Sequence, residues 1–198
     1  MRIILASASP RRQEILRNFG ILFEVITSNV NEKEVFVGVL ENMPVEIAKL
    51  KANDISKGIK EDKIVIAADT IVIYKEKVLG KPKDEEEAFS MLNMLNGNEC
   101  DIYTGLCVDV QVENVHKEYT DLAKCTVKFK ELSNVEIEKY IETKEPMDKA
   151  GAFAIQGIGA KFIDNIQGDF YAGVGMSINR LYEVLNLVKE DFNIDLDI

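Results

Sequence analysis

One histidine and three cysteines are all that this 198-residue chain offers for imidazole or thiolate chemistry. The single histidine, His116, leaves few routes to a Ser-His-Asp triad or a histidine-rich zinc site, and we expect it in a surface hairpin turn. Cys100, Cys107 and Cys125 are odd in number and share no metal-type spacing, so we expect reduced thiols. These scarcities argue against histidine-based catalysis and against a zinc centre.

Long apolar runs and excess positive charge are also missing. No 18 consecutive residues are apolar, and the N-terminus lacks a basic region followed by a long apolar one, so neither a membrane span nor a signal peptide is expected. The net charge is −10, whereas coating nucleic acid requires many Lys and Arg residues. A small polyanion can still bind where cations cluster. We therefore expect a cytoplasmic protein with neither a nucleic acid nor a membrane as partner.

Length and composition are those of a soluble globular protein. Hydrophobic residues make up 46% of the chain and charged residues 29%. A chain of this length forms one substantial core, or one domain with a cleft between two lobes. No internal repeat, low-complexity tract or linker stands out, so we expect a single domain over residues 1–198.

Apolar patterning and capping residues predict the elements. Ser9 with Pro10, Asp84 with Glu87, and Ser133 with Glu136 are helix-start signals. A hairpin is expected around Glu113-Asn114, and loops are expected over residues 145–160 and 168–175. The predicted strands cover residues 2–6, 23–27, 64–73, 100–112, 115–129 and 161–166, and the predicted helices cover 10–19, 42–58, 85–96, 134–141 and 176–188.

An acid interrupts a strongly apolar predicted strand. Asp69 and Thr70 separate the apolar residues 64–68 from the apolar residues 71–73. A carboxylate buried there needs hydrogen bonds, a cation or a metal beside it. Lys81, in a Gly80-Lys81-Pro82 turn, is a candidate cation. The alternative is that Asp69 is a strand-end or bulge residue that bonds neighbouring backbone.

Further candidates for binding a phosphorylated ligand lie along the chain. The segment from Ser7 to Arg12 places two hydroxyls and two guanidinium groups before or within the first turn of a helix, as in a phosphate cradle. The alternative there is a capped helix with two solvated arginines. Three further candidates are Glu32 as a carboxylate near a divalent ion, Lys51 as a cation, and Gln156 as a hydrogen-bonding partner of a base edge. The alternative for each of them is an ordinary solvated or loop-packing residue.

Common nucleotide-binding motifs are absent. No Walker phosphate loop is present, and the Gly157-Ile158-Gly159 segment lacks the third glycine and the strand-to-helix setting of a dinucleotide fold. Ordinary kinase and dehydrogenase functions therefore lose support. The cations, the two carboxylates and the neutral hydrogen bonders together suit phosphate chemistry assisted by a divalent ion.

Four separated motifs, in order along nearly the whole chain, resemble the Maf family of nucleotide pyrophosphatases. They are Ser7-Ala8-Ser9-Pro10-Arg11-Arg12, Ala68-Asp69-Thr70, Gly80-Lys81-Pro82 and the Asp148-to-Gly157 segment DKAGAFAIQG. The resemblance implies an α/β fold, with a mixed twisted sheet flanked by helices and two lobes around a central cleft, related to the inosine triphosphate pyrophosphatases. It also implies hydrolysis of a nucleoside triphosphate to monophosphate and pyrophosphate with magnesium or manganese, and it suggests a homodimer.

Ala-Asp-Thr and Ile-Gln-Gly are similar to the family branch that acts on dTTP and UTP; the sister branch acts on 7-methyl-GTP. The resemblance implies that Asp69 is the proton acceptor and a metal ligand together with Glu32. It implies base selection by Arg11, Thr70 and Gln156, and phosphate binding by Ser7, Ser9, Arg12, Lys51 and Lys81. Because some members are linked to septum formation, a nucleotide-binding division regulator with vestigial hydrolysis is the alternative.

Three positions depart from the family pattern. Asn31 stands where an aspartate often precedes the glutamate, which bears on the metal site. Cys100 replaces a common histidine, and Met176-Ser177 replaces a usual Leu-Pro pair. We expect the last two departures to alter packing only.

Overall fold

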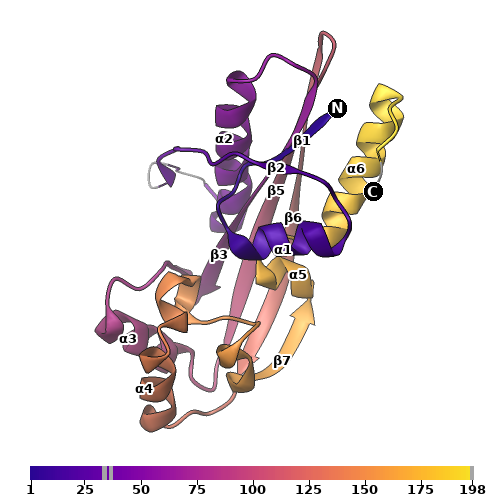
Figure 1. Cartoon of the computed structure of the whole chain (residues 1–198). Coiled ribbons are helices and arrows are strands. Elements are labelled where there is room, and N and C mark those ends of the chain that lie inside the picture. Colours follow the sequence, from indigo (N-terminus) through magenta and orange to yellow (C-terminus); the bar gives the residue numbers. More distant parts are fainter. Residues whose placement is uncertain (33–34, 36–37, 197–198) are drawn as a thin grey trace. The chain divides into compact units, whose positions relative to one another are not determined.

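The computed structural model describes residues 1–32, 35 and 38–196 and has a mixed α/β architecture (Figure 1). Within these residues one mixed sheet has the strand order β2-β1-β3-β5-β6-β7, with β4 paired to β3, and helices flank it. This confirms the predicted fold class. The strands are β1 (Arg2–Leu5), β2 (Glu24–Val25), β3 (Lys63–Tyr74), β4 (Lys77–Leu79), β5 (Glu99–Val112), β6 (Val115–Phe129) and β7 (Ile163–Gly168). The helices are α1 (Pro10–Asn18), α2 (Met43–Lys57), α3 (Glu85–Leu95), α4 (Asn134–Glu142), α5 (Phe170–Val174) and α6 (Ile178–Phe192).

The chain divides into two compact units. Unit 1 comprises Met1–Asp69, Thr104–Ala123 and Gly175–Ile198, and unit 2 comprises Thr70–Tyr103 and Lys124–Val174. Strands β3, β5 and β6 contribute residues to both units. Two units agree with the expectation of two lobes, while a single domain over residues 1–198 stays a prediction.

Parallel strands and helix α2 form part of the core of unit 1, to which α1 and α6 also contribute buried residues. β1 pairs in parallel with β2 and β3, so that Ile4 lies opposite both Glu24 and Val65. The alanines Ala48 and Ala52 of α2 are fully buried against this pair of strands. At Gly105 of β5, an added Cβ would lie 2.3 Å from backbone atoms of Pro44 and Val45. Small residues therefore let α2 approach the sheet closely.

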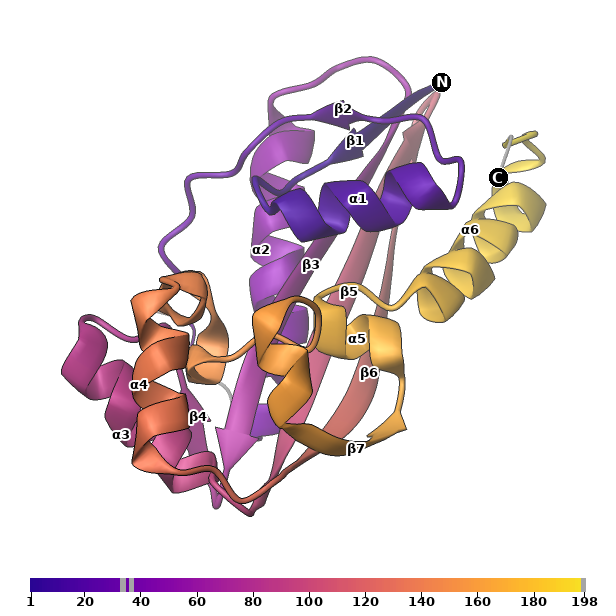
Figure 2. The ribbon, with the colours of Figure 1, turned by 60° about the horizontal axis from the view of Figure 1, so that its bottom comes forward.

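Unit 2 has an apolar core between antiparallel strands and the helices α3 and α4, which lie side by side (Figure 2). The Phe129 and Phe153 rings meet edge to face at 4.8 Å, and Tyr140 and Phe162 do so at 5.2 Å. Cys100 is buried in this core. Its place there agrees with the expectation that this departure from the family pattern affects packing.

Local signals predicted several element ends correctly. Asp84 accepts a hydrogen bond from the Glu87 N–H, and Ser133 and Glu136 form a reciprocal capping box. Glu113, with φ 52°, lies in the turn of the β5–β6 hairpin. His116 is exposed, but it is the second residue of β6 rather than part of the turn, and its ring nitrogen Nε2 lies 2.6 Å from Asp109.

Other predicted elements were wrong in extent or type. β3 contains the whole predicted strand over residues 64–73, Asp69 and Thr70 included, and is one residue longer at each end. The predicted strand over residues 23–27 is only Glu24–Val25, and the predicted loop over 168–175 contains α5. The last helix begins at Ile178 rather than Met176, with Ser177 as its N-cap and Met176 fully buried. The three cysteines are free and buried, as expected, and none of the described helices is both long and apolar enough to cross a bilayer.

Replacing Gly105 by alanine should lower the free energy of unfolding by about 3 kcal/mol, because the new Cβ would overlap the backbone of α2. Urea denaturation monitored by circular dichroism measures this change. Gly58→Ala, at the C-cap of the same helix, is the matched control, since its Cβ would lie 3.6 Å from its nearest neighbour. Equal stability of the two variants would contradict this account of the packing.

Candidate active site

A buried carboxylate is the centre of the predicted site in unit 1. Asp69 lies inside β3 and is 8% exposed, and its Oδ1 accepts a hydrogen bond of 2.8 Å from the Lys51 ammonium. The same ammonium lies 2.7 Å from Oε1 of the exposed Glu32. One cation therefore joins the two carboxylates that the sequence proposed as metal ligands.

Helix α2 places this cation. Lys51 is 8% exposed, and its neighbours Ala48 and Ala52 are buried in the core of unit 1. The close packing of α2 on the sheet thereby brings the Lys51 side chain to Asp69 of β3. The cost of burying the Lys51 ammonium is offset because it is paired with two carboxylates.

Burial is the largest influence on the Asp69 carboxyl. It raises the pKa of Asp69 above the ordinary value, while the positive charges of Lys51 and Arg12 oppose the rise. A raised pKa makes this carboxylate a stronger base than an ordinary aspartate. The alternative interpretation, a strand-end acid bonded to backbone, does not hold, because Asp69 lies mid-strand and pairs with a lysine.

The serine and arginine motif supplies a second cation near Asp69. The Arg12 guanidinium donates to the Gly175 carbonyl at 2.8 Å and to the Ser7 hydroxyl at 3.2 Å. Burial lowers the pKa of Arg12, and the negative charge of Asp69 partly offsets this effect. Because guanidinium remains protonated, a fixed positive charge lies within electrostatic range of the carboxylate.

Ser9 and Arg11 belong to the same segment but play other parts in the fold. The Ser9 backbone N–H donates to the Ser7 hydroxyl at 3.2 Å. Ser9 is the N-cap of α1 and Pro10 begins the helix, as predicted, although the Ser9 side chain makes no cap hydrogen bond. The half-buried Arg11 follows in the first turn of α1, and its charge lowers the pKa of Arg12. Unit 1 thus brings Ser7, Arg12, Lys51, Asp69 and Glu32 into one connected cluster.

The remaining predicted residues lie in unit 2. Thr70 follows Asp69 on β3 and is half-buried. Strands β3 and β4 are antiparallel, and Val72 lies opposite Leu79. The exposed Lys81, two residues after Leu79, therefore follows β4 toward the part of β3 that contains Thr70. A hydrogen bond of 3.0 Å from the Gly151 N–H to the Gly80 carbonyl joins this turn to the glycine-rich motif.

Gln156 lies near the end of that motif, on a bend just before the short 3-10 helix η5 (Ile158–Phe162), and is exposed. The turn of Lys81 and the motif of Gln156 are therefore neighbours within unit 2.

The donor types suit a divalent ion. Glu32 and Asp69 each present a carboxylate oxygen to the Lys51 ammonium and are thereby neighbours, and Mg²⁺ is commonly bound by one or two carboxylates together with substrate phosphates. No set of three His, Cys, Asp or Glu residues that could hold a metal occurs in the part of the chain that the structure describes. The two carboxylates would consequently need oxygens from a ligand and from water to complete the coordination.

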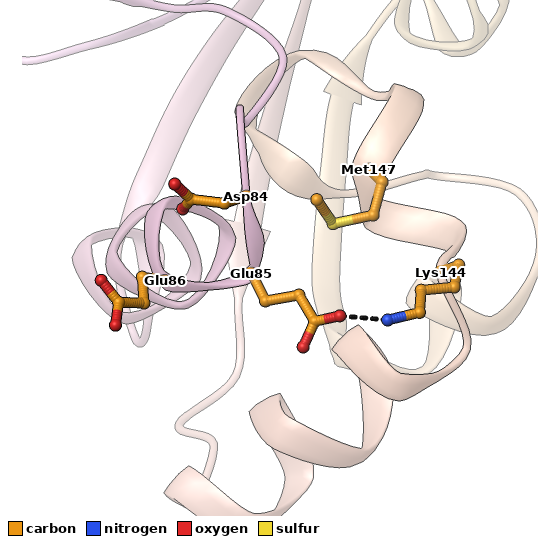
Figure 3. Close-up of a pocket in the computed structure, with 5 residues that line it drawn as sticks. All are labelled: Asp84, Glu85, Glu86, Lys144 and Met147. Carbon is orange, nitrogen blue, oxygen red and sulfur yellow. Dashed lines mark hydrogen bonds and ion pairs between the residues drawn. The ribbon is translucent and has the colours of Figure 1, made fainter.

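A hollow of about 550 Å³ lies elsewhere in unit 2 and contains none of the predicted site residues. Asp84, Glu85 and Glu86 line it together with Lys144 and Met147 (Figure 3). The ammonium of Lys144 is paired with Glu85. Three carboxylates and one paired lysine repel a polyphosphate, so this hollow does not compete with the Asp69 cluster as the candidate site.

Sequence analysis missed the carbonyl oxygen of Gly175, which orients Arg12. Gly175 has a φ of 130°, a region that favours glycine, and it directly follows α5. The Gly173-Val174-Gly175 spacing marked a special backbone position, but no sequence signal connects it to an arginine 163 residues away.

Comparison with known proteins identifies relatives over almost the whole chain. The family model described as Maf-like protein matches residues 2–188. A dTTP/UTP pyrophosphatase of Clostridium novyi (strain NT) is 50% identical over 187 residues, covering 93% of this chain and 96% of the relative. A dTTP/UTP pyrophosphatase of Thermoanaerobacter sp. (strain X514) is 44% identical over 200 residues, covering 99% and 100%. Among solved structures, the Staphylococcus aureus Ham1 protein matches with a TM-score of 0.40 and 18% identity, covering 82% of this chain and 80% of that chain.

Replacing Lys51 by methionine should raise the pKa of Asp69 further, because the variant removes a positive charge that favours the ionised carboxylate. Carbon-detected NMR titration of the aspartate side chains measures the pKa. Lys49→Met is the matched control on the same helix, since Lys49 pairs with Glu46 and Glu118 instead. An unchanged Asp69 pKa in the Lys51 variant would contradict the pairing.

Proposed function

Since this chain belongs to the Maf-like family, we propose that it is a nucleoside triphosphate pyrophosphatase that hydrolyses dTTP and UTP to the monophosphate and pyrophosphate. The names of relatives at 44 to 50% identity support this substrate class. The observation that carries the chemistry is the buried Asp69 carboxylate, which two cations from distant parts of the chain face. Such a carboxylate suits a base that accepts a proton from water.

In the proposed reaction water attacks the α-phosphorus, and Asp69 accepts its proton as the bond to the pyrophosphate leaving group breaks. Arg12 and Lys51 supply fixed positive charge where negative charge increases on the phosphate oxygens. Ser7 and Ser9 donate hydrogen bonds, and Lys81 supplies a further cation to the phosphates. Because Arg12 and Lys51 are already held by hydrogen bonds within unit 1, these two charges need little reorganisation during the reaction.

Glu32 and Asp69 would hold the divalent ion, magnesium or manganese, whose chemistry when bound is to neutralise and polarise the triphosphate. Lys51 contacts both of these carboxylates, so it would screen their mutual repulsion. Arg11, Thr70 and Gln156 are proposed to select the base. The family resemblance further suggests a homodimer, and a cytoplasmic location remains the expectation from the sequence.

A panel of triphosphates assayed for pyrophosphate release, with and without magnesium, tests the substrate assignment. We expect dTTP and UTP to give the highest kcat/KM, with 7-methyl-GTP and the standard purine triphosphates far lower. A preference for 7-methyl-GTP would refute the base assignment. Binding of dTTP without release of pyrophosphate from any triphosphate would favour the division regulator instead.

Asp69→Asn should lower kcat by about 10²- to 10⁴-fold while changing the dissociation constant for dTTP little, because the amide cannot accept the proton. In the wild type, kcat/KM should fall at low pH as Asp69 becomes protonated. The midpoint of that fall should lie above the ordinary aspartate pKa, since burial raises the pKa of this group. Steady-state kinetics over a pH series and calorimetric titration measure both effects, and near-normal turnover of the variant would exclude Asp69 as the base.

A further inference from the structure

The carboxylate of Glu145 organises the backbone on the far side of Gln156. Its Oε2 accepts a hydrogen bond of 2.8 Å from the Ile158 N–H, and its Oε1 accepts one of 3.2 Å from the Gly159 N–H. These two donors are the first two N–H groups of η5, whose own residues leave them unpaired. A carboxylate distant in sequence thus caps the segment that follows Gln156.

The hydroxyl of Tyr140 organises the backbone on the near side. It donates to Glu145 Oε1 at 3.1 Å and accepts from the Ala154 N–H at 3.2 Å. Tyr140 is fully buried in α4, where its ring packs against Phe162. The Tyr140 hydroxyl and the Glu145 carboxylate are therefore bonded to each other and hold the backbone on both sides of Gln156. The bonded residues are Ala154, two residues before it, and Ile158 and Gly159, two and three residues after it.

Two glycines show how closely the Tyr140 hydroxyl and the Glu145 carboxylate approach the backbone around Gln156. Gly157 has a φ of 95°, and a Cβ there would lie 3.0 Å from both carboxylate oxygens of Glu145. A Cβ on Gly159 would lie 2.5 Å from the Tyr140 hydroxyl. The small residues of the motif are thus required by Glu145 and Tyr140 themselves.

The Lys144–Glu145 segment is in turn fixed to the rest of unit 2. Lys144 adopts the left-handed conformation with φ 62°, and its ammonium pairs with Glu85 of α3 (Figure 3). Pro146 follows and is buried. The two residues that flank Glu145 are therefore both fixed, Lys144 by its ion pair and Pro146 by burial.

We propose that Glu145 and Tyr140 are positioning residues that set base selection by fixing the backbone on both sides of Gln156. The inference rests on the proposed function, in which Gln156 reads the base. An amide that must donate and accept with correct geometry can distinguish thymine or uracil from cytosine only if its backbone is held in place.

The test is a double-mutant cycle between Glu145 and Gln156. The measured quantity is the ratio of kcat/KM for dTTP to that for dCTP. Glu145→Gln replaces one of the two accepting oxygens by a donor that faces an N–H group, so we expect it to reduce this ratio by about tenfold. The loss should appear mainly as a higher KM for dTTP, with kcat nearly unchanged. In the Gln156→Ala background, Glu145→Gln should reduce the ratio no further.

Glu142→Gln is the matched control, because Glu142 is the exposed last residue of α4, the helix that carries Tyr140, and lies three residues before Glu145. It should leave the ratio unchanged. Tyr140→Phe is the second variant if Glu145→Gln fails to fold, since it keeps the ring packing and removes the hydroxyl. A purely structural role predicts effects that add to those of Gln156→Ala or that lower kcat for all substrates equally, and either result overturns the proposal.

Failure of the substrate assignment is distinguishable from failure of this inference. If the wild type prefers another triphosphate to dTTP, the same cycle is measured for that triphosphate against dTTP. Coupling between the two positions then upholds the positioning role although the base assignment has failed. If the wild type hydrolyses none of them, the cycle uses the ratio of calorimetric dissociation constants, and independent effects again overturn the proposal.

Discussion

The ammonium of Lys51, shared by Asp69 and Glu32, is the interaction on which the candidate site depends. A carboxylate inside a buried strand is costly unless a charge of opposite sign accompanies it. The alanine face of α2 lets the helix approach β3 closely enough for a lysine to provide that charge. The packing of unit 1 and the basicity of Asp69 therefore have one cause.

Arg12 extends this arrangement through the backbone. Its guanidinium is held by the Gly175 carbonyl and the Ser7 hydroxyl, so its position is determined before any ligand binds. Charges fixed in this way stabilise a transition state without the cost of moving dipoles. The same principle operates in unit 2, where Glu145 and Tyr140 hold the backbone around Gln156.

Element types followed from the sequence where the signal was local. The capping pairs Asp84 with Glu87 and Ser133 with Glu136 form as predicted, because their donors and acceptors lie three residues apart. Errors occurred where packing outweighed local pattern. Helix α5, for example, forms in a glycine-containing segment that had resembled a loop.

The sequence by itself determined the family, the helix caps, the hairpin turn and the set of residues capable of phosphate chemistry, since these depend on residue type and short spacing. Only the tertiary structure decided which of those residues meet. It joined Lys51 to Asp69 and Glu32, joined Arg12 to Gly175, and revealed Glu145 beneath the Gln156 loop. These contacts link residues between 13 and 163 positions apart, and contacts over such separations are set by tertiary packing rather than by any local preference of the chain.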